Sequence, residues 1–318
     1  MFIDSLILML HRIGQRNSSR ISANQNMCIK PNELLNFIES AKKKKWSFIS
    51  MDQLVDCLNV GKIPKKTIAL TFDDGYSDNY LYAYPLLSSL DVPFCVYVTT
   101  SFIENNPVPW WYELECIINS VDQIISPDGT EYAVKTLEQK NQTFMELRKG
   151  FMAGKNLARE FQFWLNRQVK IQPFETESCL FMSWEEVVTI ASSKLVTIGA
   201  HTLSHPVLAK LDDDQARKEI LSSKHILEAK LGKKIDHFAF PFGGMEDVSP
   251  RDIEFARSIG FRSAVTTRNG GLGWEKKIDC YSLPRVFFGP NFRLDGIQLH
   301  LAKSHAKQVV KKWVGHAN

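Results

Sequence analysis

The chain has 318 residues, of which 44% are hydrophobic, 11% aromatic and 23% charged. These fractions are near globular averages, so they exclude a disordered, collagen-like or coiled-coil chain. The net charge of +4 lies partly in local runs such as 42–45. Such runs are typical of solvated helix ends, so we expect no nucleic-acid partner.

The cysteines and the apolar runs indicate a cellular compartment. The six cysteines are scattered, with no C-x-x-C pair, which favours buried free thiols in a reducing compartment. No apolar run approaches the roughly 18–20 residues that span a bilayer, so we expect no transmembrane segment. Residues 1–10 are apolar but carry Asp4 and lack a basic start, which is a poor signal peptide. We therefore expect a cytoplasmic protein.

Short apolar runs alternate with amphipathic stretches, which is the rhythm of strands and helices in an α/β fold. Pro31 opens one helical pattern, and Asp212 caps another that runs to Leu231, where Gly232 ends it. There is no internal repeat and no low-complexity linker, so we predict a single domain over residues 1–318. The expected strands are Ser5–Leu10, Thr67–Phe72, Phe94–Thr99, Leu195–Ala200, His237–Phe240, Arg262–Thr266 and Tyr281–Phe288.

A largely helical insertion is predicted over residues 104–180. This stretch has no strong strand signal apart from a hairpin at Ser126–Lys135. Its aromatic residues either pack on the barrel exterior or form a lid that stacks on a substrate ring. Trp110 and Trp111 are the best candidates for stacking, because they follow Pro109 in an expected loop.

An acidic pair follows the second long strand. Within Thr71–Tyr76, Asp73 and Asp74 come directly after a short apolar run. In a β/α barrel the carboxyl ends of the strands hold the active site, and Gly75 would permit a turn that aims both side chains inward. The alternative is a turn with a capping side chain that starts a helix at Asp78. The motif alone does not distinguish the two.

A histidine pair follows another strand. His201 and His205 come after Val196–Ala200, and Pro206 biases His205 away from a helix, so the pair belongs to a loop or a first turn. Two imidazoles and one carboxylate form the three-ligand set of a catalytic zinc site, with a position open for water. A third motif, Phe240–Gly244, predicts a turn that can shape one wall of a pocket.

The three motifs, in this order and spacing, resemble those of the polysaccharide deacetylase family (carbohydrate esterase family 4). The resemblance runs through Thr71–Tyr76, His201–His205 and Pro241–Gly243, and extends to Leu10–Ile13, Met182–Trp184 and Leu283–Val286. It implies a distorted (β/α)7 barrel, which here would carry the largely helical insertion predicted above. It also implies a divalent metal, usually zinc, held by Asp74, His201 and His205.

The same resemblance assigns roles around that metal. It implies that Asp73 is the general base, that the backbone amide of Tyr76 helps bind an oxyanion, and that the sugar pocket is lined by Pro241, Phe242 and Gly243. Amide hydrolysis at neutral pH needs an activated water and a stabilised oxyanion, and a divalent cation can supply both. General base assistance of this kind adds roughly 10²–10⁴ in rate.

The chain departs from the family pattern at two points. Many members carry an arginine two residues before the proline of the third motif, where it orients the base, and here that position is Ala239. Arg285 can supply the missing guanidinium; the alternative is that it makes a surface salt bridge. The second departure is the acid that protonates the leaving amine, for which His11 and His300 are candidates and a structural histidine is the alternative.

We therefore expect a metal-dependent hydrolase that removes an acyl group, with N-acetyl favoured, from an amino sugar. A cytoplasmic location favours a lipid-linked or nucleotide-linked sugar, or a glycan precursor of envelope or capsule assembly, over a secreted polymer. N-deformylation or O-deacetylation would use the same metal centre. The alternative from another class is a catalytically silent glycan-binding barrel.

Overall fold

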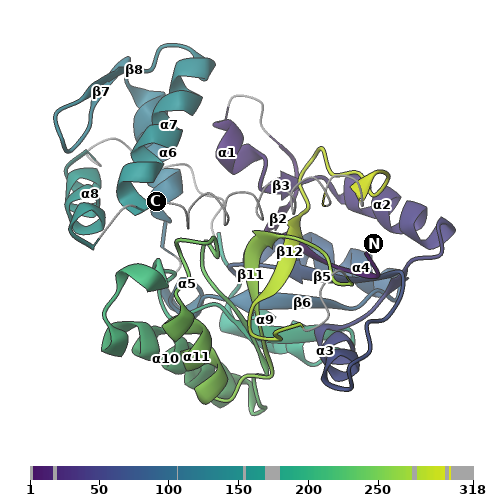
Figure 1. The fold of residues 1–318 in the computed structure, drawn as a ribbon. Coiled ribbons are helices and arrows are strands. Elements are labelled where there is room, and N and C mark those ends of the chain that lie inside the picture. Colours follow the sequence, from purple (N-terminus) through teal and green to yellow (C-terminus); the bar gives the residue numbers. More distant parts are fainter. Residues whose placement is uncertain are drawn as a thin grey trace, which may run out of the picture.

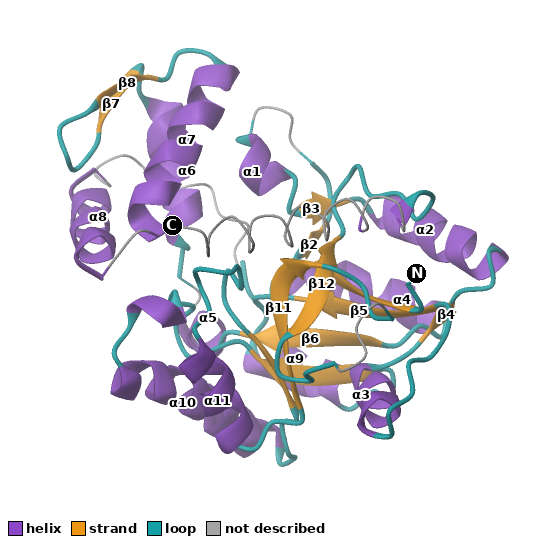
Figure 2. Ribbon diagram, in the orientation of Figure 1, coloured by secondary structure: helices purple, strands orange, loops and turns teal. Residues whose placement is uncertain are grey.

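The computed structural model describes residues 3–16, 20–105, 107–152, 155–168, 180–273, 278–297 and 301. Its centre is a closed ring of parallel strands in the order β1, β5, β6, β9, β10, β11 and β12, and β12 pairs again with β1 (Figures 1 and 2). This (β/α)7 barrel confirms the expected fold class and strands, whose bounds are β1 Ser5–Leu10, β5 Thr67–Phe72, β6 Phe94–Val98, β9 Val196–Ala200, β10 His237–Ala239, β11 Ser263–Asn269 and β12 Leu283–Phe287.

The ring is irregular at two pairings: β9 and β10 are paired through Phe238 and Ala200 alone, and the register of β11 against β12 shifts between Val265 and Asn269. Short strands that the sequence did not indicate lie outside the ring, and one of them, β4, extends it beside β5. The expected hairpin is present as an antiparallel pair, β7 and β8. The bounds of these additional strands are β2 Arg12–Ile13, β3 Cys28–Ile29, β4 Ser47–Phe48, β7 Gln123–Ile125 and β8 Glu131–Ala133.

The helices begin and end where local chemistry dictates. In α10 the Asp212 side chain accepts a hydrogen bond from the Gln215 amide (2.8 Å), and Gly232 ends the helix at a φ of 64°. The bounds are α1 Ser22–Gln25, α2 Pro31–Lys43, α3 Met51–Asn59, α4 Tyr84–Ser89, α5 Thr100–Asn105, α6 Trp110–Ser120, α7 Leu137–Met152, α8 Lys155–Gln168, α9 Trp184–Ala191, α10 Asp213–Leu231 and α11 Pro250–Ser258, with a π-helical segment at Asn79–Ala83 and a 3₁₀ turn at Leu208–Lys210.

Every second side chain along each strand points into the barrel and fills its interior. This interior cluster includes Ile7, Ala69, Cys95, Tyr97, Ala239, Val265 and Leu283, and α3 adds Met51, Leu54 and Val55 to it. Successive side chains of a strand point to opposite faces, so a residue two positions further along points the same way. Asp73 lies four positions after Ala69, and Arg285 lies two after Leu283. The strand period therefore aims both charged side chains at the barrel axis.

The described residues of the insertion form α6, α7 and α8 with the hairpin, and they share a hydrophobic cluster of their own. Figure 1 shows them together at one end of the molecule, beside α1. The expectation of a loop at Trp110 and Trp111 is wrong, because these residues begin α6. The carbonyl of Pro109 accepts hydrogen bonds from the amides of Tyr112 (2.9 Å) and Glu113 (3.2 Å), so the helix starts directly after the proline.

The described cysteines are all free thiols: Cys28, Cys57, Cys95, Cys116 and Cys280. The expectation that they are buried is correct for Cys95 and wrong for the other four, which are partly exposed. Among the described helices, we find none with the length and hydropathy needed to cross a bilayer.

Candidate active site

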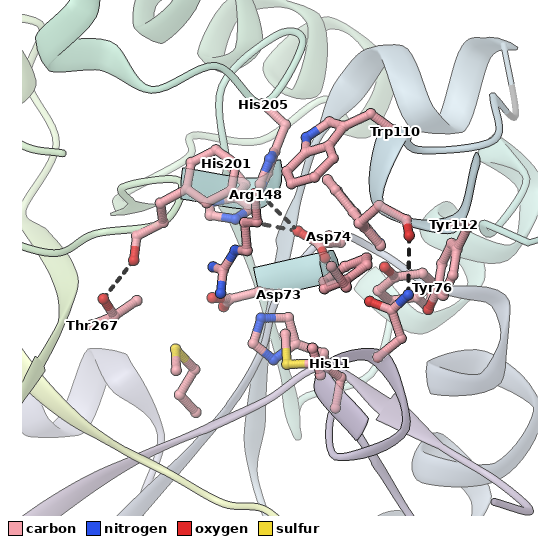
Figure 3. A pocket seen from close by; sticks show the side chains of 17 residues that line it. His11, Asp73, Asp74, Tyr76, Trp110, Tyr112, Arg148, His201, His205 and Thr267 are labelled. Atoms are coloured by element: carbon pink, nitrogen blue, oxygen red, sulfur yellow. Dashed lines mark hydrogen bonds and ion pairs between the residues drawn. The ribbon is translucent and has the colours of Figure 1, made fainter. Parts of the chain in front are cut away.

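A cavity of about 260 Å³ opens at the carboxyl ends of the barrel strands, where the insertion faces the barrel. The segments that follow the strands contribute His11, Asp73, Asp74, His201 and His205 (Figure 3). The walls come from the aromatic residues Trp110, Trp111, Tyr112 and Phe144 of the insertion and from the segment around α1. Trp110 and Trp111, the candidates for stacking on a substrate ring, therefore line the cavity, and they do so from a helix.

Asp74, His201 and His205 bring three side-chain donors to one point of this cavity. Their ligand atoms all lie within 4.8 Å of one another. Nε2 of His201 is 3.4 Å and Nε2 of His205 is 3.3 Å from Oδ1 of Asp74 (Figure 3). Asp74 and His201 are buried. The structure therefore brings together the three residues that the motifs single out as metal ligands.

The donor chemistry of this cluster fits a cation. Nδ1 of His201 lies 2.8 Å from the carbonyl oxygen of Ala239, and a carbonyl only accepts, so this nitrogen carries the hydrogen. In the neutral ring Nε2 then presents a lone pair to Oδ1 of Asp74, a buried atom without a hydrogen-bond donor among the described residues. Two facing lone pairs repel unless a positive charge lies between them. A carbonyl that fixes the ligand tautomer in this way is a frequent feature of protein metal sites.

The electrostatics of the cluster also favour a charged carboxylate. Burial alone would raise the pKa of Asp74, but His205 and His201 more than offset this and hold it well below its usual range. Burial lowers the pKa of His201, and the neighbouring Asp74 and Asp73 reverse the shift, so that its pKa is raised. Asp74 is therefore an anion at neutral pH, as a metal ligand must be.

The backbone is strained where it presents the ligands. Asp74 has a φ of 76° and His205 a φ of 62°, both in the left-handed region that residues with a Cβ rarely adopt. Pro206 keeps His205 out of a helix, as the sequence predicts, and the pair lies in a loop. Strain of this kind costs on the order of 1–3 kcal/mol per residue and concentrates at functional sites.

Asp73 lies next to the cluster and is held by Arg285. Nη1 and Nη2 of Arg285 donate to Oδ1 and Oδ2 of Asp73, each at 2.7 Å, and both side chains are buried. Nε donates to the carbonyl of Thr266 (3.0 Å), and Nη1 also donates to the hydroxyl of Thr71 (3.1 Å). The surface salt bridge considered for Arg285 is therefore wrong.

This pair fixes the protonation state of Asp73 as well as its orientation. Burial alone would raise its pKa, but the Arg285 guanidinium more than compensates and holds the pKa below its usual range. The capping alternative for this motif is also wrong, because Asp78 makes no side-chain cap. It instead accepts a hydrogen bond of 2.7 Å from Nε of Arg12.

Tyr76 leads the chain out of the acidic turn along the cavity. Its ring stacks on Phe181 with ring centres 4.9 Å apart, and the two residues form an antiparallel bridge. On either side, the amide of Ser77 donates to the carbonyl of Leu180, and the amide of Met182 donates to the carbonyl of Gly75. The backbone amide of Tyr76 has no acceptor among the described residues. It is therefore available to a ligand.

The third motif contributes through Phe242, which lines the cavity with its ring centre 4.9 Å from that of His205. Gly243 has a φ of 68°, and a Cβ at this position would lie 2.7 Å from the backbone nitrogen of Thr267. Pro241 and Gly243 do not line the cavity and instead form the turn that presents Phe242. Thr267 fastens this turn by donating its hydroxyl to the Phe242 carbonyl (2.5 Å).

Of the two candidate acids, His11 lies in the cavity and His300 lies outside the described residues. Nδ1 of His11 is buried and has no hydrogen-bond partner among the described residues. Burial lowers its pKa, against the opposing effect of Asp74 and Asp73. Its side chain follows β1 by the same two-residue period that places Asp73 after β5.

Several cavity residues carry no signal in the sequence. Asn24 in α1 donates a hydrogen bond of 3.0 Å to the carbonyl of Trp111. Arg148 projects from α7 (Figure 3). Each lies in a segment whose pattern shows only an ordinary helix. The packing of α1 and α7 over the barrel brings them to the site, and the sequence pattern does not reveal this packing.

The fold and the site define a class: a (β/α)7-barrel protein with an Asp-His-His cluster and a buried, arginine-held carboxylate at the strand ends. Residues 61–264 match the family model described as Polysaccharide deacetylase, and the chain belongs to that family. The family implies a carbohydrate substrate and a hydrolase that deacetylates it. His11 and Arg285 both lie outside the matched residues. No curated protein matches the sequence significantly.

Solved structures share the fold over nearly the whole chain. The deacetylase PplD of Streptococcus pyogenes in complex with acetate is 19% identical, with a TM-score of 0.63 over 94% of this chain and 98% of that one. IcaB from Ammonifex degensii is 17% identical, with a TM-score of 0.59 over 95% and 97%. The BpsB deacetylase domain from Bordetella bronchiseptica is 17% identical, with a TM-score of 0.53 over 90% and 96%. At these identities the likeness concerns the fold.

Proposed function

We propose that this protein is a metal-dependent hydrolase that removes an acyl group, with N-acetyl favoured, from an amino sugar. One observation carries the proposal. Asp74, His201 and His205 converge in the same cavity as a buried carboxylate, Asp73, which is aligned by two hydrogen bonds from Arg285. The family membership supplies the reaction class, and the cavity supplies the residues.

The three-ligand set is our basis for proposing zinc as the divalent metal. Two imidazole nitrogens and one carboxylate oxygen are the donors of many catalytic zinc sites. A divalent cation held there acts as a Lewis acid, which lowers the pKa of water and polarises an acyl carbonyl. His201, fixed by the Ala239 carbonyl, is preoriented for this binding.

The remaining residues of the cavity are assigned to proton transfer, positioning of the base and binding of the oxyanion. We assign Asp73 as the general base, since its carboxylate is ionised and lies next to the ligand Asp74. Arg285 is a positioning residue that acts through Asp73. The free backbone amide of Tyr76 is suited to hold the oxyanion, and His11, with an unpartnered ring nitrogen, is our candidate for the donor to the leaving amine.

The nature of the sugar is the finer part of the proposal. The aromatic wall of Trp110, Trp111 and Phe242 suits the apolar face of a sugar ring. We propose a lipid-linked or nucleotide-linked amino sugar as substrate and a cytoplasmic location. The free thiols of the described cysteines are consistent with a reducing compartment.

The test is metal analysis of the purified protein, followed by an assay for acetate and formate release from a panel of amino-sugar conjugates. We expect about one divalent ion per chain and acetate release that a chelator abolishes and added zinc restores. Formate alone would indicate a deformylase, and acetate from O-acetylated sugars alone an esterase. Bound metal without release from any conjugate would support the silent glycan-binding barrel and refute the proposal.

A further inference from the structure

Arg148 is a cation in the cavity that the proposed chemistry does not use. It projects from α7 into the cavity that holds Asp73 and Asp74 (Figure 3), and it is half-buried. Among the described residues that line this cavity it is the one lysine or arginine. A guanidinium stays protonated in proteins, so Arg148 carries a permanent positive charge. The histidines of the cavity, by contrast, are charged only when they are protonated.

The guanidinium of Arg148 is not committed to the protein. It forms no hydrogen bond and no ion pair with any residue of the described ranges, in contrast to Arg285, whose guanidinium makes four hydrogen bonds. Burial lowers its pKa, and Asp247 opposes this shift from a distance. The Asp247 carboxylate is engaged elsewhere, accepting a hydrogen bond of 2.9 Å from the amide of Gly244. The guanidinium therefore lines the cavity without a hydrogen-bond partner among the described residues, and its donors are available to a ligand.

We propose that Arg148 binds a negatively charged group, a phosphate or a carboxylate, on the amino-sugar substrate. The inference rests on the proposed function and narrows its substrate class to anionic amino sugars. A guanidinium presents a planar fork of donors that matches the oxygens of either group.

A purely structural role makes a different prediction. If Arg148 serves to attract Asp247 and so fastens α7 to the loop after the third motif, its removal disturbs the cavity for every sugar alike. Removal of the Asp247 charge should then have the same effect. The two explanations can therefore be distinguished by whether the loss of binding on removal of Arg148 depends on the charge of the sugar.

The experiment compares sugars that differ in an anionic group. N-acetylglucosamine, N-acetylglucosamine 1-phosphate and N-acetylmuramic acid are titrated into the zinc-loaded full chain. The binding signal is the intrinsic fluorescence of its seven tryptophans, of which Trp110 and Trp111 line the cavity. The variant is Arg148→Gln. The matched control is Lys149→Gln, on the same helix, where the lysine pairs with Glu146 and is 69% exposed. Deacetylation of each sugar is measured in parallel.

We expect the anionic sugars to bind about 10- to 100-fold more tightly than the neutral sugar, which is the range for a charged hydrogen-bond pair. Arg148→Gln should abolish this preference without weakening the neutral sugar, and Lys149→Gln should leave it intact. A preference for the phosphate alone would indicate a carrier phosphate as the source of the anion. A preference for the carboxylate alone would indicate an acidic sugar.

Three results would overturn the inference: no preference in the unmodified protein, an equal loss for all three sugars, or the same loss in Asp247→Asn. The proposed function is judged separately by product release. An Arg148-dependent preference without deacetylation would refute the function and keep the binding site. Deacetylation of the two anionic sugars that is unchanged in Arg148→Gln would keep the function and refute the binding site.

Discussion

Replacing Arg285 with Met would separate the base from the residue that orients it. Methionine keeps a long apolar stem in the barrel interior but removes all four hydrogen bonds of the guanidinium, two of them to Asp73. Asp73 would then be a carboxylate with 2% exposure and no counter-charge from Arg285. Removing one partner of a buried ion pair costs about 3–5 kcal/mol, so we expect a loss of this size in the free energy of unfolding.

The same reasoning predicts the outcome of a double-mutant cycle that combines Arg285→Met with Asp73→Asn. Asp73→Asn alone leaves the guanidinium unpaired and should also destabilise the protein, while the double variant leaves neither charge uncompensated. We therefore expect the double variant to be more stable than the sum of the single losses predicts, by about 2–3 kcal/mol. In activity, Asp73→Asn should lose about 10²–10⁴ in kcat, and adding Arg285→Met should lower kcat little further, because the base that Arg285 positions is already absent.

Urea unfolding of metal-loaded protein and acetate release measure the two arms of the cycle. Arg262→Met is the matched control, since Arg262 is 29% exposed and pairs with exposed carboxylates at the opposite end of the barrel. Its loss should be below about 1 kcal/mol. Strictly additive stabilities, or a double variant far less active than Asp73→Asn, would refute the idea that Arg285 acts through Asp73.

Three further changes test separate parts of the site. Asp74→Asn should lower zinc content to background while the far-ultraviolet circular dichroism is kept; retained stoichiometric zinc would contradict the ligand assignment. His11→Gln should slow amide hydrolysis about 10²-fold or more but spare an activated aryl acetate, whose leaving group needs no proton, and an equal loss on both substrates would exclude His11 as the acid. Glu115→Gln should raise KM and leave kcat nearly unchanged. The buried Glu115 carboxylate accepts hydrogen bonds from the amide of Ile21 (2.7 Å) and the side chain of Asn24 (2.8 Å), and so fastens α1 to the cavity wall. An unchanged KM would show that α1 does not shape the site.

The barrel and its charged centre could be predicted because both follow short periods in the sequence. Buried strands can be recognised in the sequence by their apolar composition. Polar residues directly after such strands lie at the carboxyl ends of a parallel barrel, where active sites form. Asp73, Asp74 and His201 each follow such a strand, so their convergence needed no knowledge of the loops. The left-handed backbone at Asp74 and His205 was not foreseen, because neither is a residue type that marks it as glycine does.

The insertion and its contribution could not be predicted in the same way. Trp110 and Trp111 read as a loop because two prolines precede them, yet the second proline simply starts α6. Arg148 lies in an amphipathic helix whose pattern shows which face packs inward but not what lies opposite. The docking of α7 over the strand ends depends on contacts between segments far apart in the chain, and single-sequence periodicity carries no information about these.

The arginine that orients the base lies on a different strand from the one that the family pattern predicts. The family pattern places this charge on the strand that here ends in Ala239, and the small alanine belongs to the interior cluster of the barrel. In a closed barrel the inward side chains of all strands share one axis, so a guanidinium from β12 reaches the same carboxylate as one from β10 would. What the site requires is a cation in that layer of the barrel, on whichever strand. The third motif alone would therefore miss this charge, whereas the wider resemblance, which includes Leu283–Val286, singles out Arg285, and the two-residue strand period explains why it points at Asp73.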